Sequence, residues 1–316
     1  MRLQQRVSRA RYGEVNFASG GPDRVAAMAL FEPDAALAAL RQDPTGAGLR
    51  LRRLLPGGQV IDDSRGLPLM WLSDTAPGPD DVAWARAAYP VTGLWPLLLG
   101  ANAADERVSA GRSCADPPPE GRDSTSTLYP FLFGAIDSDR WCVPESGDAE
   151  QILSSYWPGR LAEFGDTAVP GTRLWPGLAP AQPLPADPVR FADGMAGYLL
   201  AQGWLGLPRL ALVPCPSSSE ALISLRLVLA GNGPSTDDIA VVLRSWEQRF
   251  GARLIGVQPD ALHLSVAAAP LDRAQATRVA YEHFALDADV VLQSSDSFHD
   301  YVDELIDVDI WTLWWD

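Results

Sequence analysis

Histidine and carboxylate side chains towards the C-terminal end of the chain are the residues best suited to chemistry. His263, His283 and His299 are the three histidines of the sequence. His283 follows Glu282 and precedes Asp287 by four residues, a spacing that puts His283 and Asp287 on one face of a helix. Such a pair could bind a metal ion, or the carboxylate could orient the imidazole as a general base.

A structural role is the interpretation we favour for these histidines. The helix that contains His283 is expected to end before Asp287, and its dipole stabilises a histidine near its C-terminus. His263 alternates with Leu262 and Leu264, so we expect it on a solvated sheet face, with a position in a cleft as the alternative. His299 has no partner that the sequence identifies.

The common catalytic motifs are missing from the sequence. It has no H-E-x-x-H, G-x-S-x-G or G-x-G-x-x-G pattern, and it has no lysine, so a P-loop lysine, a Schiff base and a Ser-Lys dyad are excluded. We expect no cofactor, and no metal outside the enzymatic alternative. That alternative is a hydrolase or metal-dependent enzyme that uses Glu282, His283, His263 and Asp287.

The distribution of charge is the more informative signal. The chain has 25 Arg, 40 Asp and Glu, a net charge of −15 and a pI near 4.6. Residues 1–56 carry nine Arg against five acids, whereas residues 287–316 carry nine acids and no Arg. An acidic face is often only a solvated surface. It can also attract a basic protein, because opposed electrostatic fields raise association rates and select partners.

Our first functional prediction is therefore a non-enzymatic protein-binding module that acts as an immunity protein or regulator. Its acidic surface is expected to consist of Asp296, Asp300, Asp303, Glu304 and Asp307. Four of these five residues, all except Glu304, share one face at helical spacing. A structural or housekeeping scaffold remains a further alternative.

Composition also indicates the cellular compartment of the protein and the kind of partner it binds. Cys114, Cys142 and Cys215 are odd in number and form no C-x-x-C motif, a usage typical of reducing compartments. No apolar run is long enough to span a bilayer, and the start of the chain lacks the apolar region of a secretory signal. We predict a cytoplasmic protein with a basic protein partner, without membrane association, and without direct nucleic-acid binding because the pI is low.

The pattern of hydrophobic residues predicts an α+β fold with small mixed or antiparallel sheets packed against helices. We expect a basic arm over residues 1–23, an N-terminal α+β region over 24–230 with a mobile loop near 101–126, and a C-terminal module over 231–316. This module reads as α-β-β-α-α-β, and its helix Thr236–Phe250 carries an apolar stripe that includes Trp246. Upstream, we expect strands at Leu49–Leu55 and Gln59–Asp62, and helices that Pro90 stops and Pro158 breaks.

The C-terminal module resembles a known family. The resemblance rests on four stretches: Leu243–Val257, Leu262–Val266, Ala280–Phe284 and the terminal Trp314–Asp316. Their order and spacing are similar to those of the bacterial domain of unknown function 4253 family, and features within residues 45–100 are similar to its longer members. The resemblance covers residues 45–100 and 135–316, and it implies a shared module and no particular activity. Family members tend to continue after the last helix of this set with Phe-Cys-Pro-Asp, which Ala285–Asp289 replaces here.

Overall fold

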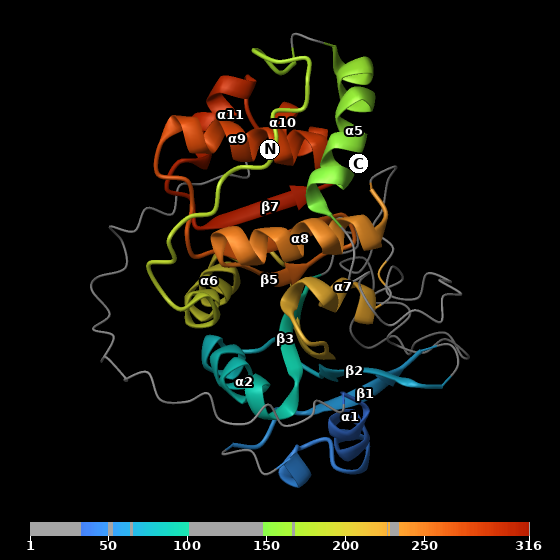
Figure 1. Cartoon of the computed structure of the whole chain (residues 1–316). Helices are drawn as coiled ribbons and strands as arrows, with labels where there is room; N and C mark the ends of the chain where they lie inside the picture. The colour runs from blue at the N-terminus through green and yellow to red at the C-terminus, as the bar shows by residue number, and fades with distance from the viewer. Residues whose placement is uncertain are drawn as a thin grey trace, which may run out of the picture.

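The protein is built around one mixed β-sheet (Figure 1). The computed structural model describes residues 33–49, 53–63, 66–100, 148–165, 168–225, 227 and 234–315. Its strands are β1 (Gly58–Asp62), β2 (Pro68–Ser73), β3 (Leu94–Leu99), β4 (Arg209–Pro214), β5 (Ala252–Val257), β6 (Ala261–Val266) and β7 (Ile310–Trp314). They form a seven-stranded sheet in the order β1-β2-β4-β3-β5-β6-β7.

Neighbouring strands run antiparallel except at the centre of the sheet. There β3 and β5 are parallel, with Leu98 opposite Gly256 and Leu99 opposite Val257. This pair joins strands from both sides of the boundary that we expected near residue 230. The α+β class predicted from the sequence is confirmed, with the strands of the described chain united in one sheet.

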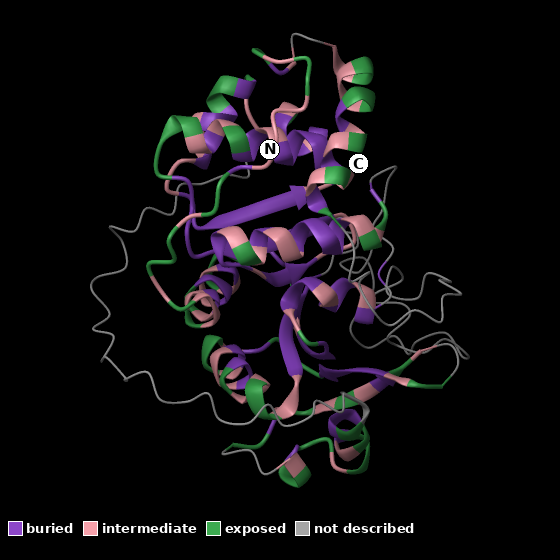
Figure 2. Ribbon diagram, in the orientation of Figure 1, coloured by how far each residue is buried: buried purple, intermediate pink, exposed green. Residues whose placement is uncertain are grey.

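Helices cover both faces of the sheet. On one face lie α1 (Pro33–Gln42), α2 (Pro79–Thr92) and α6 (Pro188–Gln202). On the other lie α5 (Ala149–Phe164), α7 (Ala221–Ser224), α8 (Thr236–Phe250), α9 (Arg273–Leu286), α10 (Ala288–Leu292) and α11 (Phe298–Leu305). Two apolar cores fill the space between the sheet and these two layers. Figure 2 shows the central strands buried, with the exposed residues on the outer sides of the helices.

Alternation along each strand divides its side chains between the two cores. In β3, Trp95 and Leu97 belong to the core under α8 and α9, whereas Leu94 and Leu98 belong to the core under α2 and α6. A strand that is buried on both faces carries apolar residues at consecutive positions. The run of apolar residues in β3 therefore reflects its central place in the sheet.

Capping residues set the ends of the main helices. The Asp187 side chain accepts a hydrogen bond from the Val189 N–H at 2.9 Å at the start of α6, and Gly203 ends that helix in a left-handed conformation. The Ser235 side chain caps α8 in the same way, and Gly251 ends α8 with a φ of 60°. These contacts satisfy backbone groups that have no partner inside the helix.

Several local predictions were wrong. Described residues of the expected strand Leu49–Leu55 lie in a short 3-10 turn or in irregular structure, and β1 begins at Gly58. Helices α2 and α5 continue past Pro90 and Pro158, because a proline inside a helix removes one hydrogen bond that neighbouring packing can offset. The expected arm over 1–23 and the expected loop over 101–126 lie outside the described residues.

Candidate functional site

Helix α11 carries part of the acidic surface predicted from the sequence. The Ser297 side chain caps the helix by accepting a hydrogen bond from the Asp300 N–H at 3.2 Å. The buried side of α11 carries Phe298, Tyr301, Val302 and Leu305, which pack in the core with α9. The apolar residues thus turn one side of the helix inward and leave its acidic side chains towards the surface.

Of the five predicted acidic residues, Asp300, Asp303 and Glu304 lie in α11. The predicted shared helix face was wrong for the other two, because Asp296 precedes α11 and Asp307 follows it with a φ of 56°. Asp296 and Asp300 are exposed, and the other three are partly exposed. Asp303 forms an ion pair with Arg273 of α9, in which Arg273 Nε donates a hydrogen bond to Asp303 Oδ1 at 2.9 Å. The carboxylate of Glu304 accepts a hydrogen bond from the Ser295 hydroxyl at 2.7 Å. The acidic surface is therefore partly neutralised at Asp303.

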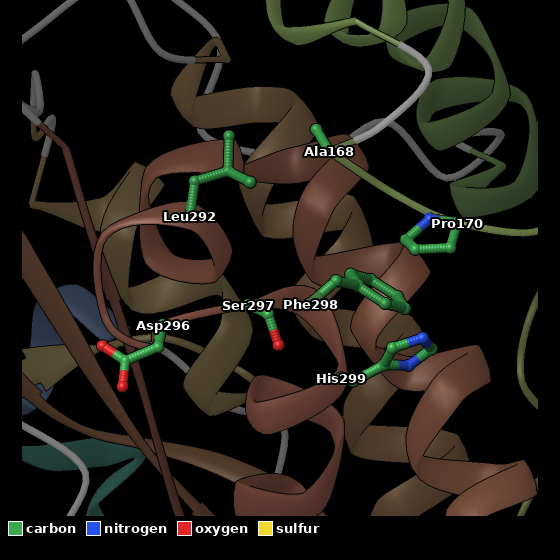
Figure 3. Close-up of a pocket in the computed structure, with 7 residues that line it drawn as sticks. All are labelled: Ala168, Pro170, Leu292, Asp296, Ser297, Phe298 and His299. Carbon is green, nitrogen blue, oxygen red and sulfur yellow. The ribbon is translucent and has the colours of Figure 1, made fainter.

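A surface pocket of about 250 Å³ adjoins this acidic surface. Its lining consists of Ala168, Pro170, Leu292, Asp296, Ser297, Phe298 and His299. Figure 3 shows Leu292 and Asp296 on one side and Pro170, Phe298 and His299 on the other. The pocket thus combines apolar walls with one carboxylate and one imidazole. Ala168 and Pro170 come from an irregular segment far from α11 in the sequence, and no sequence signal pointed to them.

The Glu282 carboxylate is enclosed by a complete set of donors. Its Oε1 accepts hydrogen bonds from Arg249 Nη1 at 2.7 Å and from the Ala179 N–H at 2.6 Å. Its Oε2 accepts from Arg249 Nη2 at 2.6 Å and from Trp246 Nε1 at 2.7 Å. The Glu282 side chain is fully buried. These contacts join α8, α9 and the segment before α6, so they give Glu282 a structural role.

His283 is also inside the core. Its Nδ1 lies 2.7 Å from the Tyr301 hydroxyl, and its ring packs at 4.8 Å from the Trp311 ring and 5.0 Å from the Trp246 ring. Burial lowers the pKa of His283 to about 3, because a low-dielectric surrounding disfavours the charged imidazole. His283 lies in the last turn of α9, as expected, but its ring is enclosed by aromatic side chains, which differs from the capping role that we expected.

His263 is buried on the other face of the sheet, and the prediction that it faces solvent was wrong. Leu262 and Leu264 belong to the core under α8 and α9, whereas His263 alternates with them and packs 6.5 Å from the Trp204 ring. Its ring nitrogens lie 3.0 Å from Thr312 Oγ1 and 2.9 Å from Gln258 Oε1. These contacts satisfy an imidazole without solvent, and burial lowers the pKa of His263 to about 4.

Asp287 connects α9, α10 and β7. Its carboxylate accepts hydrogen bonds from the Val290 N–H at 3.2 Å and from the Trp314 N–H at 2.9 Å. Burial raises the pKa of Asp287 to about 7, in opposition to these two donors. The structure therefore does not bring Glu282, His283, His263 and Asp287 together around one shared site.

Two further features of the described chain bear on the kind of site present. In the described ranges, no three His, Cys, Asp or Glu side chains are grouped so that they could hold a metal ion. Among the same residues, no helix has both the length and the apolar character needed to cross a bilayer. The acidic surface and its pocket, described above, are the candidate site that we consider further.

The described chain is an α+β protein with a candidate binding surface at its C-terminal end. Residues 209–316 match the model of a family described as Domain of unknown function (DUF4253). This match confirms the resemblance of the C-terminal module and includes β4, but it does not reach residues 45–100. No curated protein and no solved structure matches the chain.

Proposed function

We propose that this protein is a non-enzymatic, cytoplasmic binding module that holds a basic partner protein on its acidic C-terminal surface, as an immunity protein or regulator does. We use the term acidic surface for Asp296, Asp300, Asp303, Glu304 and Asp307. The observation that carries the proposal is the pocket that opens beside these residues, with Asp296 in its lining.

The balance of charge supports a basic partner. The chain has a net charge of −15, which repels acidic partners and attracts basic ones over a Debye length of about 8–10 Å at physiological salt. Ion pairing with Arg273 reduces the charge available at Asp303. Asp300, which is exposed, and Asp307, which is partly exposed, therefore contribute more of the attraction. Both are suitable positions for a test.

The pocket adds shape complementarity, which electrostatic attraction alone does not provide. Arginine and lysine side chains have apolar stems and charged ends, and the pocket offers apolar walls at Leu292 and Phe298 beside the carboxylate of Asp296. A basic side chain of the partner would place its stem against these walls. Buried contacts of this kind give most of the affinity, whereas charges at the rim set association rate and specificity.

The test is a quantitative affinity capture from the native extract with matched variants. The surface variant carries Asp300→Asn and Asp307→Asn, and the control variant carries Asp74→Asn and Asp80→Asn, which lie in the N-terminal part of the chain. All four side chains are exposed or partly exposed. Each variant therefore loses two negative charges, and each substitution preserves the shape of the side chain.

We expect the wild type and the control variant to retain a basic protein at low salt and to release it at high salt. The surface variant should retain about ten-fold less, because each exposed charge pair contributes up to about 1 kcal/mol. Equal retention by the two variants would mean that only net charge matters, and it would contradict the proposed surface.

A further inference from the structure

Arg86 of α2 is a buried cation whose hydrogen bonds are incomplete. Its side chain is 0% exposed, and its Nε donates to Asp193 Oδ1 of α6 at 2.8 Å. Its Nη1 and Nη2 are also buried, and neither has a hydrogen-bond partner in the part of the chain that the structure describes. A buried polar group without a partner calls for an explanation such as an ordered water or an ion.

Positive charge is in excess around Arg86. The Arg253 side chain of β5 is close enough to repel the Arg86 guanidinium, while Asp193 is the attracting carboxylate. Arg253 Nη1 donates to the carbonyl of Ala252 at 2.6 Å. The Arg86 guanidinium thus has one carboxylate partner, Asp193, and one like charge nearby, Arg253. Burial lowers the pKa of Arg86 to about 10 and raises that of Asp193 to about 6, so their attraction does not offset desolvation.

The surroundings of the guanidinium are rigid and aromatic. Its central carbon lies 4.5 Å from the centroid of the Trp95 ring. Trp95 Nε1 in turn donates to the Leu254 carbonyl at 2.9 Å, next to Arg253 in β5. This contact holds the start of β3 against β5 upstream of their first paired residues, Leu98 and Gly256. The Trp95 ring thus fixes the position of the guanidinium group.

We propose that Arg86, together with Arg253, binds a small monovalent anion of about the size of chloride. Such an anion would accept hydrogen bonds from Nη1 and Nη2 and would neutralise the excess positive charge, which is costly to bury without a counter-charge. The full burial of Arg86 favours a small anion over a phosphate or a larger carboxylate. A water molecule could accept the same hydrogen bonds but would not neutralise the excess positive charge. The two explanations therefore differ in whether stability depends on the anion present.

The first test is thermal unfolding at constant ionic strength, with gluconate replaced stepwise by chloride. An anion that binds only the folded protein stabilises it in proportion to its saturation, and at about 100 times its Kd it should raise Tm by about 5 °C. The exposed pair of Arg41 with Asp62 provides the matched control. We expect the shift in the wild type and in Arg41→Gln, and its loss in Arg86→Gln. Equal chloride dependence in all three proteins would overturn the proposal.

A second measurement does not depend on the folding of Arg86→Gln. Bromide is close to chloride in size and quenches tryptophan fluorescence, so bromide bound at Arg86 would quench Trp95, with saturation at low bromide concentration. Exposed tryptophans are quenched only by collision, in linear proportion to bromide. We expect a saturable component in the wild type that Trp95→Phe lacks. Linear quenching without that component would show that no such anion is bound, and would favour water at Nη1 and Nη2.

Discussion

His263 and His283 lie on opposite faces of the seven-stranded sheet. His263 of β6 packs against Trp204, in the layer of α6, whereas the ring of His283 lies 4.8 Å from that of Trp311 in the core under α8 and α9. A shared catalytic arrangement needs the two groups within hydrogen-bond reach of one substrate atom, directly or through one water. The sheet between them prevents this, and both rings have structural partners.

Both buried histidines should make the fold sensitive to acid. An unfolded histidine has a pKa of about 6.5, and burial lowers the pKa to about 4 for His263 and about 3 for His283. The unfolded chain therefore binds more protons between these values, and stability is lost as the pH falls from about 6.5 to about 4 or 3. Asp193 and Asp287, whose pKa values are raised to about 6 and about 7, act in the opposite direction.

Replacing His263 isolates one of these contributions. Between pH 6.5 and 4, we expect the free energy of unfolding to fall less in His263→Gln than in the wild type. The difference should reach up to about 3 kcal/mol, since one pKa unit corresponds to about 1.4 kcal/mol. Urea unfolding at several pH values measures this difference. The exposed His299 provides the control, and His299→Gln should follow the wild-type profile. A parallel pH profile for His263→Gln would show that its protonation is not coupled to folding.

The buried ion pair between Arg249 and Glu282 should be costly to break. Glu282→Gln leaves Arg249 with a neutral partner, while both side chains remain largely out of water. Removing one partner of a buried pair destabilises a protein by about 3–5 kcal/mol. Asp303→Asn, which breaks an exposed pair with Arg273, should reduce stability by about 1 kcal/mol or less. Similar losses in denaturant unfolding of the two variants would contradict the anchoring role of Glu282.

Two glycines that end helices provide a comparison of packing at the same backbone conformation. Gly251 and Gly203 have φ values of 60° and 67°. A Cβ at Gly251 would lie 2.8 Å from Leu184 Cδ2 and 2.9 Å from Pro188 Cγ, whereas at Gly203 nothing lies within 4 Å. Gly203→Ala should reduce stability by about 1 kcal/mol, the cost of left-handed backbone. Gly251→Ala should reduce it by at least about 1 kcal/mol more, which thermal unfolding can measure.

Loss of the Asp287 carboxylate should loosen the last strand. Asp287→Ala removes the cap of α10 and leaves the Trp314 N–H without its acceptor. Loss of the cap and loss of the acceptor should each reduce stability by about 1 kcal/mol or more. We expect faster hydrogen exchange at the Trp314 amide than in the wild type. Unchanged exchange at this amide would mean that Asp287 does not fix the end of β7.

The sequence could predict what depends on local pattern. The expected bounds of the helix Thr236–Phe250 are those of α8, because the residues that cap it, Ser235 and Gly251, act over a short range of sequence. Trp246 was expected in the core and is buried there. The environment of His263 could not be predicted, since alternation with leucines does not show that helices cover the second face of the sheet. A histidine on that face is satisfied by Gln258, five residues upstream, and by Thr312, which only the fold brings near.

The candidate site was predictable only in its charge. The acidic residues Asp300 and Asp307 were visible in the sequence, and both are at least partly exposed, Asp300 in α11 and Asp307 in the turn that follows it. The pairing of Asp303 with Arg273 depends on how α9 and α11 pack, and the pocket depends on Ala168 and Pro170, which arrive from a distant segment. Long-range packing of this kind leaves no local signal.

Site-specific photo-crosslinking tests the proposed binding surface most directly. A photoreactive phenylalanine derivative would replace His299, which is exposed and lines the pocket, or Leu207, which is 73% exposed between α6 and β4. The proposed function predicts a basic partner protein crosslinked through position 299 at low salt, little crosslinking at high salt, and none through position 207. Equal crosslinking at the two positions, or crosslinking through position 207 alone, would contradict it.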